Sequence, residues 1–155
     1  MNHTIAATAT RMRGFALVDP ENQTIWGGRR LEVAAASAVF DEIEFYVGGM
    51  PTTAALAPSL LCPYLPLIAD RGWGLDVVAP SPDAADLALM ERARFAIECG
   101  YTDLVIVSGD HIFAELAKHS RLHVVTHADR LSRSLEAVAT SVSFLGAGTG
   151  APVAA

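Results

Sequence analysis

The sequence predicts one α/β domain built around a doubly wound parallel sheet. The chain has 155 residues, a length that suits a single domain able to bury a full core. Hydrophobic residues make up 52% and charged residues 18%, whereas a disordered chain needs low hydrophobicity and high charge. Between Phe15 and Leu145 short apolar runs alternate with helical stretches. This alternation is typical of a parallel sheet that helices cover on both faces.

Five strands and five helices are expected. The strands are short runs rich in Val, Ile, Leu or Phe, most of them bounded by Gly, Pro, Asp or Ser: Phe15–Val18, Ile43–Val47, Leu75–Val78, Leu104–Val107 and Leu122–Thr126. The helices between and after them are Arg30–Phe40, Thr53–Ala69, Pro82–Glu98, Phe113–Lys118 and Leu131–Ala139. Repeated strand–helix units imply right-handed crossovers and a three-layer domain. Ligands of such sheets bind at the carboxyl ends of the strands, where the strand order reverses.

The domain is expected to span residues 14–145, between a lead segment at 1–13 and a flexible tail at 146–155 that is small, Gly-rich and uncharged. The start of the chain has no apolar region followed by a cleavage site, so no signal peptide is expected. The longest mostly apolar stretch, Ala54–Ala69, contains three prolines and is too short to span a bilayer. Cys62 and Cys99 form no metal-binding spacing, and we expect reduced, mostly buried thiols of a cytoplasmic protein.

Two carboxylates follow predicted strands directly. Asp19 comes after the first strand and Asp110 after the fourth. If these strands are neighbours where the strand order reverses, the two side chains lie at one edge of the sheet. An ordinary turn at Asp19-Pro20 and a helix cap at Asp110 remain the structural alternatives.

A third carboxylate, Asp86, lies on the apolar face of a predicted helix. Ser81-Pro82 is expected to cap and begin this helix, and Asp86 then shares a stripe with Met90, Ala93 and Ile97. A carboxylate in that position is costly unless it is paired, hydrogen-bonded or bound to a metal. The alternatives are that the first turns of the helix emerge into solvent, or that Asp86 pairs with an arginine.

Three neighbouring carboxylates are stable as anions mainly when a cation lies between them, and hard oxygen ligands favour Mg²⁺ or Mn²⁺. Such a cation can activate water and hold a phosphodiester, which is nuclease-like chemistry. The glycine-rich nucleotide-binding loops, the GxSxG elbow and the HExxH metal motif are absent from the sequence. Receiver domains and haloacid-dehalogenase-type phosphatases are also disfavoured, since their acidic motifs are missing. His111 could be a ligand or a general base, although a solvent-facing histidine at a helix start is the simpler interpretation.

Four segments together resemble the NYN domain family of PIN-like nucleases. Asp19–Asn22 resembles the Asp-x-x-Asn motif after the first strand of that family. Ala85–Leu89 resembles the segment that carries an Asp at the start of the third helix. Leu104–Phe113, which reads LVIVSGDHIF, resembles the SGDxDF motif after the fourth strand, and Ser132–Leu145 resembles the closing helix and strand.

This resemblance implies a five-stranded parallel sheet in the order 3-2-1-4-5 and metal-dependent hydrolysis of RNA, which we expect to be single-stranded. Asp19, Asp86 and Asp110 would be the catalytic residues and would hold Mg²⁺ or Mn²⁺. Asn22 would orient a ligand or the substrate, and Ser108 of the SGD motif would contact the substrate.

The chain departs from the family pattern at two places. Ile112 stands where the family has a second acid, and Ala84-Ala85 stands where it often has Lys-Gly. The alternative function is therefore a weak or inactive PIN-like module that binds RNA or a protein partner. A homodimer is one of the two association states left open, beside the monomer.

The net charge of −6 disfavours global attraction to nucleic acid, so RNA binding would need a local basic patch or a bound cation. Arg29 and Arg30, at the start of the first predicted helix, and Arg130 and Arg133, at the start of the last, are the candidate phosphate contacts. Solvated helix ends are the alternative interpretation of these four arginines.

Overall fold

The computed structural model describes residues 13–146. The first half of the chain forms β1 (Gly14–Val18), α1 (Pro20–Thr24), β2 (Ile25–Trp26), β3 (Arg29–Arg30), α2 (Val33–Val47), β4 (Thr52–Leu56), α3 (Pro58–Asp70) and β5 (Gly74–Val77). The second half forms α4 (Ala84–Glu98), β6 (Asp103–Val107), the 3-10 helix η1 (His111–Lys118), β7 (Arg121–Thr126), the 3-10 turn η2 (Ala128–Arg130), α5 (Arg133–Val138) and β8 (Ser141–Phe144). Most of the predicted lead segment and tail lie outside the described residues.

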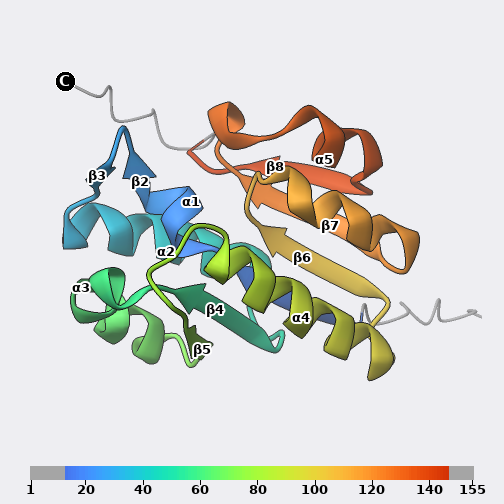
Figure 1. Cartoon of the computed structure of the whole chain (residues 1–155), viewed down its shortest axis with the longest axis horizontal. Helices are drawn as coiled ribbons and strands as arrows, with labels where there is room; N and C mark the ends of the chain where they lie inside the picture. Colours follow the sequence, from blue (N-terminus) through green and yellow to red (C-terminus); the bar gives the residue numbers. More distant parts are fainter. Residues whose placement is uncertain (1–12, 147–155) are drawn as a thin grey trace, which may run out of the picture.

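Six strands form a parallel sheet in the order β5-β4-β1-β6-β7-β8, and β2 and β3 form a separate antiparallel hairpin (Figure 1). The predicted α/β class with a doubly wound parallel sheet is confirmed. From β1 the chain moves outward to β4 and β5, and it then returns to the other side of β1 with β6. The strand order therefore reverses between β1 and β6, next to the carboxyl end of β1.

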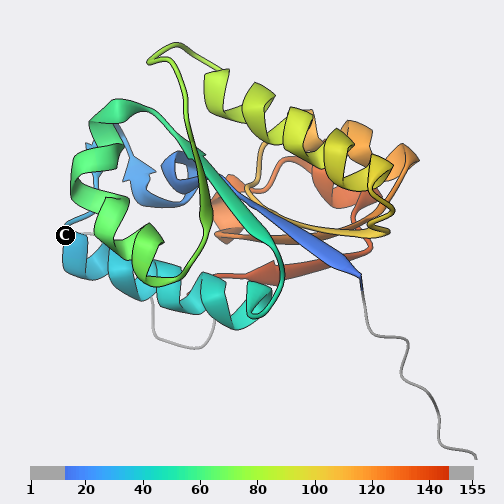
Figure 2. The same ribbon diagram turned by 90° about the horizontal axis from the view of Figure 1, so that it is seen from below.

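Two hydrophobic cores lie on the two faces of the sheet. On one face α2 and α3 pack against the strands through residues such as Phe40, Ile43 and Tyr64. On the other face α4, η1 and α5 pack through residues such as Leu89, Phe113 and Leu135. Figure 2 shows α2 and α3 on the opposite side of the sheet from α4. The resulting three layers are helices, sheet and helices.

The predicted second strand, Ile43–Val47, is wrong, because this segment is the last part of α2. The buried residues of α2 are Ala36, Phe40, Ile43 and Val47, which recur at the spacing of one helical face. The true strand in this part of the chain is β4, which the sequence analysis placed inside a helix at Thr53–Ala69. Pro58, at the first position of α3, marks the actual boundary between strand and helix.

The prediction of five strands in the order 3-2-1-4-5 is not confirmed as it was made. One of its five strands was a helix, and β8 adds a sixth strand beside β7. The other boundaries shift less: α2 begins at Val33 rather than Arg30, and α4 begins at Ala84 rather than Pro82. Ser81-Pro82 therefore precedes α4 instead of starting it.

Two further features are the exposure of the cysteines and the length and apolar character of the helices. Cys62 and Cys99 are free thiols, but both are exposed, so the prediction that they are mostly buried is wrong. Among residues 13–146, no helix combines the length and the apolar character that a membrane crossing requires.

Candidate functional site

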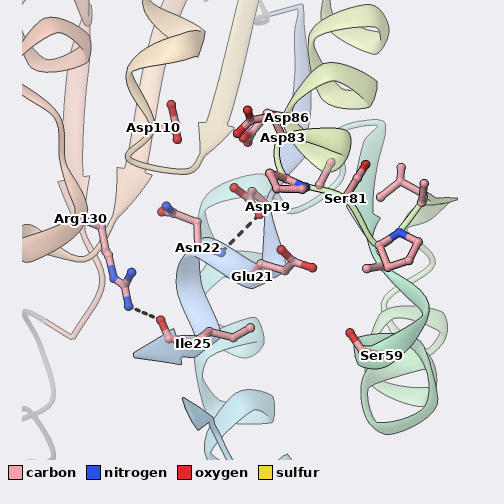
Figure 3. A pocket seen from close by; sticks show the side chains of 16 residues that line it. Asp19, Glu21, Asn22, Ile25, Ser59, Ser81, Asp83, Asp86, Asp110 and Arg130 are labelled. Atoms are coloured by element: carbon pink, nitrogen blue, oxygen red, sulfur yellow. Dashed lines mark hydrogen bonds between the residues drawn. The ribbon is translucent and has the colours of Figure 1, made fainter. Parts of the chain in front are cut away.

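An open cleft of about 590 Å³ lies at the carboxyl edge of the sheet, where the strand order reverses (Figure 3). Its walls come from α1, the start of α3, the loop between β5 and α4, and the loop after β6. Five carboxylates line it: Asp19, Glu21, Asp83, Asp86 and Asp110. Asn22 and Arg130 are also among the lining residues. Ligands of doubly wound sheets bind at this position.

Asp19 caps the N-terminus of α1 directly after β1. Its backbone is extended, and one carboxyl oxygen accepts the backbone N–H of Asn22 at 3.3 Å. The other oxygen accepts the hydroxyl of Ser108 at 3.2 Å. Only 5% of the residue surface is exposed. Asp19 therefore caps a short helix instead of starting an ordinary turn, and its nearly buried carboxyl lies at the base of the cleft.

Asp86 reaches the same point from the first turn of α4. The pKa of Asp19 is raised to about 7, chiefly because the carboxyl is buried and secondly because Asp86 is negatively charged nearby. The pKa of Asp86 is raised to about 6 by its burial and then by the charges of Asp110 and Asp83. A hydrogen bond between Asp19 and Asp86 opposes this rise for Asp86. Burial and like charge thus both favour the protonated form of these two side chains.

Asp110 is the N-cap of η1 and is less buried than Asp19. Its carboxylate accepts the backbone N–H of Ile112 at 2.9 Å, so the predicted capping role is present. Nδ1 of His111 lies 3.1 Å from the same carboxylate oxygen, and the His111 side chain is largely exposed to solvent. Asp110 therefore has a structural function and also lines the cleft.

Asn22 and Ser108 connect Asp19 to the loop that carries Asp110. The side-chain oxygen of Asn22 accepts the backbone N–H of Gly109 at 3.0 Å, which joins α1 to the loop after β6. Ser108 is fully buried, and its hydroxyl oxygen also accepts the backbone N–H of Asp110 at 3.3 Å. Ser108 therefore bridges Asp19 and Asp110 from beneath and does not line the cleft.

Gly109 allows the loop after β6 to lie directly against η2. A Cβ atom on this glycine would be 2.0 Å from the carbonyl oxygen of Arg130, which is far inside contact distance. The Gly109 carbonyl in turn accepts the backbone N–H of Ser132 at 2.9 Å. This close approach brings Arg130 to the same side of the cleft as Asp110 (Figure 3).

The four candidate arginines do not all lie where the sequence analysis placed them. Arg29 and Arg30 form β3 of the hairpin rather than the start of a helix, and both are exposed. Arg130 lies in η2, ahead of the last helix, and Arg133 is the first residue of α5. The Arg130 guanidinium donates to the carbonyl of Ile25 and lies over the ring of Trp26, 4.6 Å from its centroid.

Glu21 and Asp83 are cleft residues that were not predicted from the sequence. Glu21 stands within the Asp19–Asn22 motif, so its position beside Asp19 was available as a signal. Asp83 precedes α4 with a left-handed φ of 63°, a conformation that no pattern in the sequence indicated. Within residues 13–146, no three His, Cys, Asp or Glu side chains are grouped closely enough to form a ready-made metal site.

The class that fold and site define is a three-layer α/β protein with an acidic cleft at the reversal of the strand order. No protein-family model and no curated protein matches the chain. Its structure is similar to the crystal structure of a protein of unknown function, VPA0982, from Vibrio parahaemolyticus RIMD 2210633. The TM-score is 0.63 and the sequence identity 12%, over 88% of this chain and 95% of that chain. This likeness concerns the fold alone.

Proposed function

We propose that the chain is an NYN-type, PIN-like endoribonuclease that hydrolyses phosphodiester bonds of single-stranded RNA with Mg²⁺ or Mn²⁺. The observation that carries this proposal is the pair formed by Asp19 and Asp86. These two residues come from distant parts of the sequence, and both line an open cleft at the carboxyl edge of the sheet, where the charge of Asp86 acts on the nearly buried Asp19. The resemblance of the three Asp segments to the family motifs supports hydrolysis as the reaction and RNA as the substrate.

The chemistry of the cleft fits a hard divalent cation. Five carboxylates line it, and the pKa values of Asp19 and Asp86 are both raised, first by burial and then by the neighbouring negative charges. Mg²⁺ typically binds through one or two carboxylates, keeps several waters and takes substrate phosphate oxygens as further ligands. Asp19 and Asp86 would supply the carboxylates, with Asp110 as the third acidic residue. A bound cation lowers the pKa of water and stabilises charge on the phosphodiester.

The other residues of the site hold these groups in place. Asn22 fixes α1 to the loop that carries Asp110, and Ser108 orients the Asp19 carboxyl from beneath. Because Ser108 is fully buried, we assign it a positioning role rather than a substrate contact. Arg130 places a positive charge at the edge of an otherwise acidic cleft, where it would bind a phosphate of the RNA. Arg133 is exposed at the start of α5 and would bind a neighbouring phosphate.

A second candidate function is a PIN-like module that binds RNA or a protein partner without efficient catalysis. Ile112 favours it, because this side chain packs against the core that includes Phe113 and Leu116 instead of supplying an acid to the cleft. A cytoplasmic location is proposed with both functions.

A cleavage assay separates the two candidates. A labelled single-stranded RNA and a DNA of the same sequence are incubated with the protein in Mn²⁺ or in EDTA. We expect cleavage of the RNA in Mn²⁺ alone, and a rate lowered about 100-fold or more by Asp19→Asn or Asp86→Asn, since each removes a proposed metal ligand. Asp70→Asn, which changes an exposed carboxylate at the end of α3, should keep the parent rate. RNA binding without cleavage would favour the binding module.

A further inference from the structure

The hairpin of β2 and β3 stands beside the acidic cleft as a separate basic element (Figures 1 and 3). Gly27 and Gly28 form its turn with φ values of 54° and 74°, the positive φ pair of a tight two-residue hairpin. The base of the hairpin is fixed, because Leu31 N–H donates to Thr24 O at 2.9 Å and the Tyr64 hydroxyl donates to Leu31 O at 2.8 Å. The tip is therefore held in a defined position.

Arginines elsewhere on the molecule are mostly paired with carboxylates. Arg71, Arg92, Arg94 and Arg121 pair with Asp41, Asp76, Glu115 and Asp103, respectively. Among residues 13–146, Arg29, Arg30, Arg130 and Arg133 have no such ion pair and belong to the hairpin and to the η2–α5 segment, whereas Arg13, which also has none, lies over the ring of Tyr101. In a chain of net charge −6, guanidinium groups without a carboxylate partner are the places where a phosphate can bind.

Trp26 determines where the guanidinium of Arg130 lies. The indole face lies under the guanidinium, while the indole N–H donates to Asp129 at 3.2 Å and the ring edge meets His127. A cation–π contact holds the arginine without neutralising its charge. The Nη2 atom of Arg130 donates to the carbonyl of Ile25, next to Trp26, which adds a second contact between the guanidinium and the hairpin.

We propose that the β2–β3 hairpin is the RNA-binding lip of the cleft, in which Arg29 and Arg30 bind backbone phosphates outside the acidic site and Trp26 positions Arg130 for the phosphate nearest to it. This inference rests on the proposed function, because it takes the ligand of the cleft to be single-stranded RNA. The RNA backbone then passes from the aspartates over Arg130 to the exposed hairpin. Trp26 is a positioning residue, since it acts through Arg130.

The test measures binding apart from cleavage. Fluorescence anisotropy of a fluorescein-labelled oligouridine is recorded in EDTA from about 50 to about 200 mM salt, and each phosphate contact on a single strand contributes ~0.7 to the slope of log affinity against log salt. We expect R29A/R30A to reduce that slope by about 1.4, twice the value for one contact. R29K/R30K should keep most of the slope, because the charges remain.

The matched control is R92A/R94A on α4, which removes the same charge at two residues that do not line the cleft. Its slope should stay close to the parent value. Equal losses in R29A/R30A and R92A/R94A would show an effect of net charge alone and would overturn the proposal. A parent that does not bind oligouridine, or hairpin variants that bind like the parent, would also overturn it.

Trp26 is tested through Arg130. W26A and R130A should weaken oligouridine binding to the same degree, and combining them should add little, because both remove one contact. W26F should retain binding, since Phe also offers an aromatic face. Additive losses would contradict the positioning role. If the hairpin variants lose binding but the parent shows no Mn²⁺-dependent cleavage, the proposed nuclease activity is wrong and the proposed role of the hairpin stands. If the parent cleaves RNA but the hairpin variants bind like the parent, the proposed role of the hairpin is wrong and the nuclease activity stands.

Discussion

Asp19 and Asp86 are residues whose ionisation opposes folding in the absence of a cation. Their pKa values, about 7 and about 6, lie above the ordinary 3.8. Between about pH 4 and 7 the folded chain therefore binds more protons than the unfolded chain, so the contribution of this pair to stability falls as the pH rises. The sign follows from burial and like charge, both of which disfavour the ionised form.

This pair leads to a prediction on pH dependence. In EDTA, the parent should lose stability between about pH 5 and about pH 8, and Asp86→Asn should lose less. At the higher pH the variant should be more stable than the parent by about 1–2 kcal/mol, a value reduced for solvent screening at this half-buried carboxyl. Urea unfolding at both pH values measures the difference, with Asp70→Asn as the control. A variant that follows the parent curve would contradict the raised pKa of Asp86.

Ile112 provides a second prediction at this scale. The side chain is partly buried against the core formed with α4 and η1, so Ile112→Asp would place a carboxyl beside apolar groups without a partner. We expect a loss of stability of about 1–3 kcal/mol and no larger gain from Mn²⁺ than the parent shows. Ile112→Val, which keeps the apolar contact, should cost less than half as much. Thermal unfolding with and without Mn²⁺ measures both effects, and a stable variant with a larger Mn²⁺ gain would refute the structural assignment.

At the scale of elements, a polar network joins three strands at the edge opposite the cleft. Asp103 on β6 accepts Nε and Nη2 of Arg121 at 2.8 and 2.7 Å and lies 2.9 Å from Nε2 of His123, both on β7. Nδ1 of His123 lies 2.8 Å from the hydroxyl of Ser141 on β8. The hydrogen bonds from Arg121 and then His123 hold the pKa of Asp103 far below its usual range, although its burial acts against this.

The network predicts that Asp103→Asn lowers stability at neutral pH more than it does at low pH. Because the pKa of Asp103 is lowered on folding, its stabilising effect is present above about pH 4 and is lost as the pH falls. At neutral pH the variant should be less stable than the parent by about 2–4 kcal/mol, since Arg121 and His123 lose a buried partner. Chemical unfolding at about pH 7 and about pH 3 should show this difference shrinking at the lower pH. Asp76→Asn, which breaks the more exposed pair with Arg92, should cost less than about 1 kcal/mol.

The elements that could be predicted from the sequence are those whose apolar runs are short and bounded by turn residues. β1, β6 and β7 were found because Gly, Asp or Ser lies next to each run. Ile43–Val47 failed, since a run of apolar residues at the end of an amphipathic helix looks like a strand when it is taken alone. The first four residues of β4, TTAA, carry little apolar signal, and the pairing with β1 and β5 decides their conformation.

The candidate site was predictable to the extent that its residues follow strands. Asp19 and Asp110 were found because the carboxyl ends of parallel strands meet at one edge, and the structure brings both to the cleft. The burial of Ser108 and the stacking of Arg130 on Trp26 could not be predicted. They depend on contacts between residues that are far apart in the sequence, Ser108 with Asp19 and Arg130 with Trp26. Such contacts leave no periodic pattern in the sequence.

For the whole molecule, a bound cation should raise the temperature of unfolding. A ligand that binds only the folded chain stabilises it by about 2.7 kcal/mol when its concentration is 100 times the dissociation constant. We expect Mn²⁺ to raise the Tm of the parent and to have little effect on Asp19→Asn. Asp70→Asn should respond as the parent does, because its carboxylate lies outside the cleft. An equal rise in the parent and in Asp19→Asn would show that Mn²⁺ binds elsewhere.

The association of the whole molecule stays a prediction. Both outer strands of the sheet, β5 and β8, have a neighbour on one side only, and the large apolar side chains of Val77, Leu87 and Phe95 are exposed near β5 and on α4. Sedimentation equilibrium would distinguish a homodimer from the 16.4 kDa monomer.

The reversal of strand order also has a consequence during synthesis. Asp19 and Asp86 come from the part of the chain before Gly100, whereas Asp110 and Arg130 come after it. During synthesis the chain makes β4 before β6, so one neighbour of β1 is available before the other. The two aspartates are therefore made before the wall that carries Arg130. A product that stops early, anywhere before residue 130, lacks one side of the cleft, and only the nearly finished chain can assemble all of it.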